Sequence, residues 1–123
     1  MNIALFNNTS YGYNTRNRGT LLYSGQLKQK TFDYTMDVSQ SGRVNLFVFE
    51  KHPKFGWEFV GHGRVIENVS PRTEHDAPVW KIALENSYYN NKFIYYTNKS
   101  EILTTMGLRP KYKNLALGII PLE

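Results

Sequence analysis

Hydrophobic and polar residues alternate most clearly in residues 31–38. Four apolar residues alternate there with threonine and aspartate residues, which is the two-residue period of a strand with one buried face. After a polar turn, residues 43–51 continue as a second strand, with Phe47 and Phe49 on one face and Leu46 among the apolar residues of the other. A strand that is apolar on both faces is typical of a central position in a sheet.

The rest of the chain predicts more strands and little helix. Gly61 and Gly63 indicate a bulge, a sharp bend or the close approach of another backbone, and sharp bending is how a small sheet closes into a barrel. Residues 88–96 fit either a strand or an aromatic loop. A short helix is expected at residues 101–106, because Ser100 could cap its start and a glycine follows its end. Further strands are expected at residues 20–23, 57–66, 78–84 and 115–120.

Short strands at this spacing predict a mainly β protein. We expect a small closed or strongly coiled β-barrel with one or two short helices, formed by a single domain of 123 residues. Leu122 and Glu123 are either the remnant of a cloning junction or the natural sequence. The expected parts are a basic loop or arm at 1–19, the barrel core at 20–97, a short helix with a terminal strand at 98–121, and the two residues 122–123.

The composition excludes several kinds of protein. The chain contains no cysteine, so a disulfide framework, a thiolate zinc site and a cysteine nucleophile are excluded. Without disulfides, a cytoplasmic location is the default expectation. No apolar run approaches the roughly 18 residues of a membrane-spanning helix, and no membrane partner is expected.

The positive charge is concentrated at the two flanks of the chain. The net charge is +5, and the first 32 residues contain four basic and no acidic residues. Lysine and arginine neutralise phosphates and release condensed counterions, so this distribution favours a polyanion as partner. A basic surface that only keeps the protein in solution is the alternative. The residues expected to contact phosphates are Arg16, Arg18, Lys28, Lys30, Lys111 and Lys113.

Signals for catalysis are weak, and we expect no catalytic residue, no metal site and no cofactor. The most enzyme-like group is Glu74-His75-Asp76, but sequence neighbours point in different directions on an extended chain. For His62, a structural role satisfied by neighbouring backbone is favoured over a binding role. Phosphate-loop and nucleophile-elbow motifs are missing from the sequence.

Four segments carry a resemblance to a known kind of domain. They begin with Arg18-Gly19 and continue through residues 44–51, 57–65 and 78–84. Their order resembles a small uncharacterised domain that is appended to helicase-like and endonuclease proteins of bacterial restriction loci. That domain is similar to the PUA-like and SRA-like barrels, some of which read methylated cytosine. The resemblance implies a module for modified DNA, with a nuclease or helicase domain downstream in the same protein.

A reader of modified double-stranded DNA extrudes the target base into a site walled by aromatic rings. Trp57 is the first candidate, because it follows a turn and would lie at the rim of a barrel. Asp33 or Asp37 could accept a hydrogen bond from an exocyclic amino group. Any one of the rings also fits an ordinary core position. The candidate base-pocket residues are Trp57, Tyr23, Tyr34, Phe59 and Asp33, with Trp80 as a further ring.

The sequence therefore predicts a DNA-binding specificity module rather than an enzyme. Besides a role in protein interaction alone, two other functions stay open. One is the capture of a small anionic ligand such as a nucleotide signal, which would use similar cations and rings. The other is a metal-dependent nuclease built on Glu74, His75 and Asp76.

Overall fold

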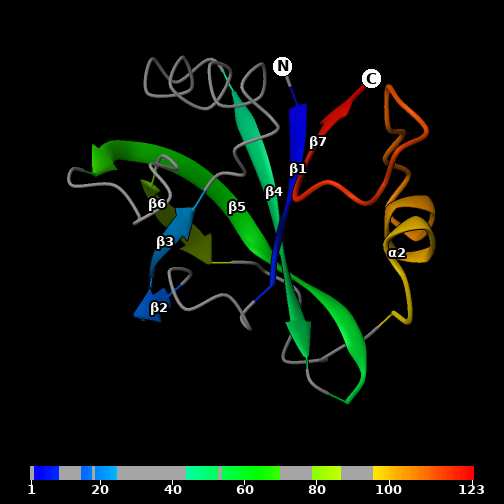
Figure 1. The fold of residues 1–123 in the computed structure, drawn as a ribbon, viewed down its shortest axis with the longest axis horizontal. Coiled ribbons are helices and arrows are strands. Elements are labelled where there is room, and N and C mark those ends of the chain that lie inside the picture. Colours follow the sequence, from blue (N-terminus) through cyan, green and yellow to red (C-terminus); the bar gives the residue numbers. More distant parts are fainter. Residues whose placement is uncertain are drawn as a thin grey trace.

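Seven strands of the described residues form one mixed sheet in the computed structural model of the protein (Figure 1). The strand order is β2-β3-β6-β5-β4-β1-β7, with β1 and β4 parallel and every other neighbouring pair antiparallel. The prediction of a mainly β protein is confirmed. The elements are β1 (Asn2–Asn7), β2 (Thr15–Asn17), β3 (Thr20–Ser24), β4 (Asn45–His52), β5 (Gly56–Val69), β6 (Val79–Asn86), α2 (Lys99–Thr105) and β7 (Ile119–Leu122).

The described residues include most of the predicted elements. The strand predicted at residues 31–38 lies outside them, as does most of the segment 88–96. From that segment Tyr96 is described, and it forms an isolated β-bridge with Trp57. The structure describes residues 2–8, 15–17, 19–24, 44–52, 54–69, 79–86 and 96–123.

The strands predicted at residues 20–23, 43–51, 57–66 and 78–84 are observed as β3, β4, β5 and β6. The central position predicted for β4 is confirmed, because β4 lies between β5 and β1. The helix begins earlier than predicted: its N-cap is Asn98 rather than Ser100, and the Asn98 side chain accepts a hydrogen bond from the Glu101 amide at 2.8 Å. The last strand begins at Ile119, later than predicted, and Leu122 is a buried member of it.

Residues 15–17 form β2, so the expectation of a loop throughout residues 1–19 is wrong there, and it is also wrong at β1. This strand lies between β4 and β7, and residues 3–7 are buried. Its apolar run is short and shows no alternation, since Ile3 and Leu5 pack on one face of the sheet while Ala4 and Phe6 pack on the other. A strand that is buried on both faces loses the two-residue pattern by which strands are recognised.

The sheet is strongly bent, but it does not close into a barrel, which corrects the closed form of our prediction. The register shifts along β5 opposite Val48 and Phe49 and again between Val65 and Glu67, so the glycine signal for a bulge is confirmed. Closure would require β2 to pair with β7. The free edge of β7 is instead covered by the chain after α2, where the Lys111 amide donates to the Pro121 carbonyl at 2.9 Å.

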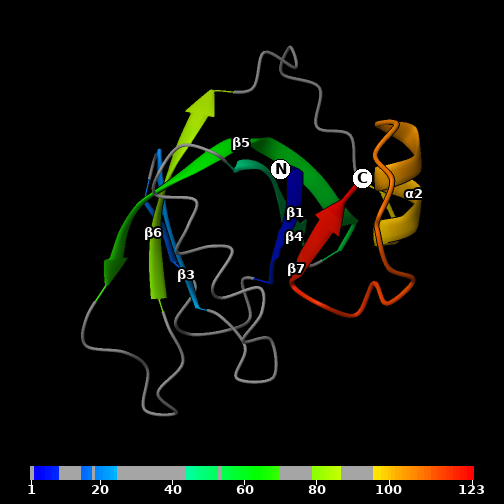
Figure 2. The same cartoon turned by 90° about the horizontal axis from the view of Figure 1, so that it is seen from above.

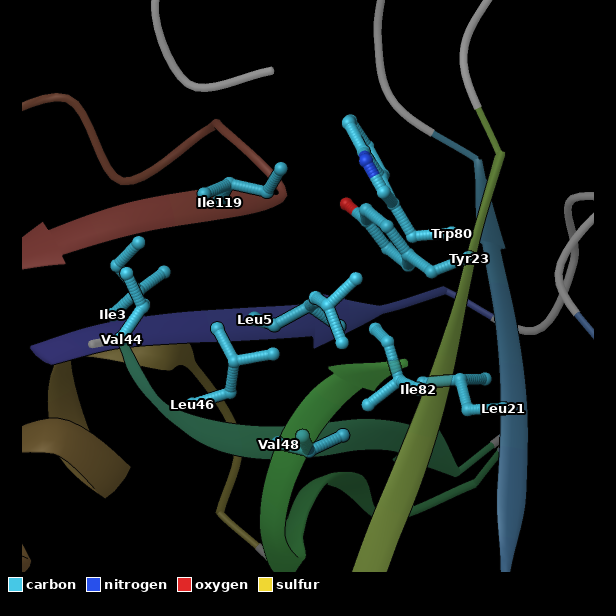
Figure 3. Close-up of a cluster of buried hydrophobic side chains, with 11 residues drawn as sticks. Ile3, Leu5, Leu21, Tyr23, Val44, Leu46, Val48, Trp80, Ile82 and Ile119 are labelled. Atoms are coloured by element: carbon cyan, nitrogen blue, oxygen red, sulfur yellow. The ribbon is translucent and has the colours of Figure 1, made fainter. Parts of the chain in front are cut away.

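The bend gives the sheet an inner and an outer face (Figure 2). On the inner face, Ile119 of β7 belongs to the same buried cluster as Tyr23 of β3 and Trp80 of β6 (Figure 3). On the outer face, α2 covers part of β1 and β5, with Ile102 and Leu103 buried against them. The strands therefore separate two clusters of different composition.

Gly63 shows how tightly the inner face is packed. A Cβ atom at this position would lie 2.8 Å from a methyl carbon of Ile82 and 2.9 Å from one of Val48. Both distances are below the van der Waals limit, so only glycine allows β4 and β6 to place these side chains together across β5.

Candidate nucleic-acid interface

Three partly exposed rings lie together on the outer face of β4 and β5, and we call Phe47, Phe59 and His62 the ring row. The His62 ring lies 4.8 Å from Phe47 and 5.6 Å from Phe59, measured between ring centroids. The two phenylalanine rings are 6.4 Å apart. These separations are those of interacting aromatic rings.

The bulge in β5 is what brings the ring row together. Phe59 and His62 are three positions apart, and in a regular strand they would point to opposite faces. The register shift leaves Val60 unpaired, so that Phe59 pairs with Phe49 and His62 pairs with Phe47. One extra residue therefore turns both rings to the same side.

The orientation of His62 is set by a hydrogen bond. Its Nδ1 lies 3.3 Å from the side-chain oxygen of Asn45, at the start of β4. With that oxygen as acceptor, Nδ1 carries the proton, and Nε2 of the neutral ring is an acceptor. The ring row can thus offer a hydrogen-bond acceptor as well as apolar surface.

A second group of rings lies beside the ring row and includes two lysines. Phe6 stacks on Phe49 at 4.6 Å and meets the edge of Trp57 at 5.1 Å, and Phe49 also contacts Phe59 at 5.5 Å. The ammonium nitrogen of Lys51 lies 5.9 Å from the centre of the Trp57 ring. Lys99 approaches the same ring, and we call Lys51, Trp57 and Lys99 the lysine–indole cluster.

Lys99 is the most constrained cation of the described residues. Its Nζ donates to the carbonyl oxygens of Leu115 and Leu117, both at 3.0 Å, and lies 5.0 Å from the Phe6 ring and 5.4 Å from the Trp57 ring. Burial lowers the pKa of Lys99 below its ordinary value, and the positive charge of Lys51 lowers this pKa further. The side chain also ties the loop before β7 to the first turn of α2.

The structure separates the predicted base-pocket residues. Trp57 and Phe59 both lie on the outer face, where Trp57 is 8% exposed and Phe59 is partly exposed. Tyr23 is 2% exposed and lies with Trp80 in the inner cluster, on the other side of the sheet. Tyr23 and Trp57 therefore do not face one common site. Tyr34, Asp33 and Asp37 lie outside the described residues.

The predicted phosphate contacts are also spread over the sheet. Lys111 and Lys113 are exposed on the segment between α2 and β7, beside one edge strand. Arg16 lies in β2, the other edge strand. Arg18, Lys28 and Lys30 lie outside the described residues.

Sequence reasoning missed the residues that the outer face does bring together. The alternation in β4 placed Phe47 on one face with Phe49, and this was the available signal for the ring row. Lys51 is the cross-strand partner of Trp57, two residues before the turn that our prediction identified. No sequence pattern pointed to Lys99, because its contact with Trp57 joins segments that are far apart along the chain.

The described residues show no arrangement typical of a metal site. Within the stretches that the structure covers, no three histidine, aspartate or glutamate side chains are placed to hold a metal ion. Glu74, His75 and Asp76 lie outside these stretches. None of the helical segments described is long and apolar enough to cross a membrane.

Comparison with protein-family models, with curated proteins and with solved structures found no match. The class of protein is therefore defined by the fold and by the residues on the outer face of the sheet. It is a mainly β protein whose open, bent sheet of seven described strands carries aromatic rings beside lysines.

Proposed function

We propose that the protein binds nucleic acid through the outer face of β4 and β5, with bases stacked on the ring row. The observation that carries the proposal is the exposure of these rings on a sheet face. Phe47, Phe59 and His62 are in mutual contact and yet remain partly exposed. Aromatic rings on a sheet surface are a common platform for unstacked bases, because every base has a face that can stack.

Cations on the strands that carry the ring row favour the same partner, although the exposed Glu85 of β6 pairs with His62. Lys51 and Arg64 are exposed on the strands that carry the rings. The whole chain has a net charge of +5. Cations beside a stacking surface neutralise the phosphates that accompany the bases, which makes binding dependent on salt.

The finer form of the proposal follows the resemblance to readers of modified DNA. In this form the partner is double-stranded DNA with an extruded base such as methylated cytosine, and a nuclease or helicase domain would act on the recognised site. The base would then lie against Phe59 on the outer face, since Tyr23 faces the inner cluster. The PUA-like or SRA-like type belongs to this finer proposal.

The ring row can be tested with the double variant Phe47→Leu/Phe59→Leu. Fluorescence anisotropy would measure its binding to labelled single-stranded DNA, plain duplex and duplex with methylated cytosine, each at several salt concentrations. Stacking on an aromatic ring contributes about 1–3 kcal/mol per base, so one lost stack weakens binding roughly 5- to 150-fold. Modified duplex as the tightest ligand would support the finer form, and no such preference would contradict it.

The matched control is Phe55→Leu, which shortens a ring in the same way at a position that is 56% exposed and outside the ring row. The control should bind like the wild type. Unchanged binding by the double variant, or binding that is indifferent to salt, would contradict the proposal.

The capture of a small anionic ligand is the second candidate. The lysine–indole cluster favours it, because two ammonium groups approach one ring there. This candidate would be supported over the first if a nucleotide raises the melting temperature of the protein and the protein does not bind DNA.

A further inference from the structure

Two positive charges approach the same indole ring in the lysine–indole cluster. Lys51 extends from β4 and is exposed, whereas Lys99 belongs to the first turn of α2 and is partly buried. Their ammonium nitrogens lie 5.9 and 5.4 Å from the centre of the Trp57 ring. Like charges near one another repel, and an anion bound beside them would reduce this repulsion.

No carboxylate of the described residues serves as a counter-ion for the lysine–indole cluster. Within the described residues, neither Lys51 nor Lys99 forms an ion pair with a carboxylate, and the charge that acts on Lys99 is the positive charge of Lys51. The indole ring attracts both cations but carries no net charge to neutralise them. A partly buried cation without a carboxylate partner is costly, which makes the cluster a candidate for binding rather than for stability.

Lys99 is already positioned for an anion. A lysine ammonium has three N–H donors, and the carbonyls of Leu115 and Leu117 each accept a hydrogen bond from Nζ at 3.0 Å. These bonds hold the side chain in one conformation and use two of its three N–H donors. Less conformational entropy is then lost when an anion binds.

We propose that Lys51 and Lys99 form a phosphate-binding site beside Trp57. The group that it takes is a phosphate, either in a nucleic-acid strand or in a free nucleotide. The inference rests on the proposed function only for the first source. Phe6 and Phe49 form a continuous series of ring contacts from Trp57 to Phe59, so a strand phosphate at the site would lie on the same face as a base at the ring row.

The first measurement is the melting temperature in inorganic phosphate, compared with potassium chloride at equal ionic strength. Phosphate should raise the melting temperature of the wild type in a concentration-dependent manner, because it binds the folded state. Lys51→Gln should abolish this rise, and its fold is expected to be retained because Lys51 is exposed. Lys54→Gln is the matched control, since Lys54 is an exposed lysine three residues away, and it should respond like the wild type.

Tryptophan fluorescence gives a second readout that a general stabilisation would not produce. Trp57 belongs to the cluster, whereas Trp80 is fully buried on the inner face. Phosphate should change the emission of Trp57 in the wild type and in Lys54→Gln, but not in Lys51→Gln. If phosphate changes neither the emission nor the melting temperature, or if Lys51→Gln responds like the wild type, the site does not exist.

A base-free deoxyribose-phosphate oligomer distinguishes the two sources of phosphate. If strand phosphates use the site, this oligomer binds and Lys51→Gln weakens it at least tenfold, while Phe47→Leu/Phe59→Leu leaves it unchanged. If inorganic phosphate binds but neither the oligomer nor DNA does, the site binds a free phosphate ligand, and the proposed function is wrong. If DNA binding requires the ring row but not Lys51, the proposed function stands and the phosphate site is wrong.

Discussion

The two faces of the sheet use different chemistry. The inner cluster is mostly aliphatic, with Leu5, Leu46 and Ile82 at 0% exposure. The outer cluster is built around Phe6, Phe49 and Trp57, includes two lysines near its rings, and passes into the partly exposed ring row. The inner face therefore contributes mainly to stability, whereas the outer face combines burial with groups that can contact a ligand.

The largest expected effect is on the inner face. Ile82→Ala should lower the free energy of unfolding by about 2–5 kcal/mol, because it removes a fully buried side chain and leaves a cavity beside Val48 and Gly63. Urea denaturation would measure the change. A loss below about 1 kcal/mol would mean that the inner cluster rearranges easily and does not carry most of the stability.

Asn7 is an exception to the apolar inner face, and its replacement should have the next largest effect. Alternation along β1 places it on the same side as Leu5, it is 1% exposed, and neither polar atom of its side chain has a hydrogen-bond partner among the described residues. A buried amide without a partner costs about 1–3 kcal/mol, so Asn7→Leu should raise the free energy of unfolding. A lower midpoint in urea would show that the amide has a partner in solution.

The pH dependence of stability tests the charges of the outer face. Because burial and Lys51 lower the pKa of Lys99 in the folded state, the unfolded chain binds more protons between that lowered pKa and the ordinary lysine value of about 10.4. The contribution of Lys99 to stability should therefore rise with pH in this window. In Lys51→Gln the rise should be smaller, since one cause of the lowered pKa is removed.

Urea midpoints measured at intervals from pH 8 upward, for the wild type, Lys51→Gln and the control Lys54→Gln, would show this difference. A curve for Lys51→Gln that is identical to the wild-type curve would contradict the coupling between Lys51 and Lys99.

The smallest effect on stability is expected in the ring row. Phe47→Leu exchanges one partly exposed apolar side chain for another, so the free energy of unfolding should change by no more than about 1 kcal/mol. Its binding to single-stranded DNA should still weaken. A large loss of stability with unchanged binding would assign Phe47 to the core and remove the contrast between the two faces.

The strands were the most predictable part of the protein. The apolar patterns of β4 and β6 and the turn before Trp57 placed these elements close to their observed bounds. β1 escaped detection, because its short apolar run is buried on both faces and has no alternation. The local sequence pattern also could not predict whether the sheet closes into a barrel, since closure depends on whether the edge strands meet.

The candidate site was less predictable than the strands. Trp57 and Phe59 could be named because large rings near a turn are visible in the sequence. The sequence did not show, however, that they lie on the opposite face of the sheet from Tyr23. That choice depends on where the extra residue of the β5 bulge falls, and a shift of one residue moves every later side chain to the other face.

The amino-acid sequence by itself determined a mainly β chain with a positive net charge, because side-chain alternation and charge are local properties. Tertiary structure alone decided that the sheet stays open, that Tyr23 and Trp57 lie on opposite faces, and that Lys99 meets Lys51 at one indole ring. These outcomes depend on strand register and on contacts between distant segments. Such contacts form only when the whole sheet has assembled, and no short stretch of sequence encodes them.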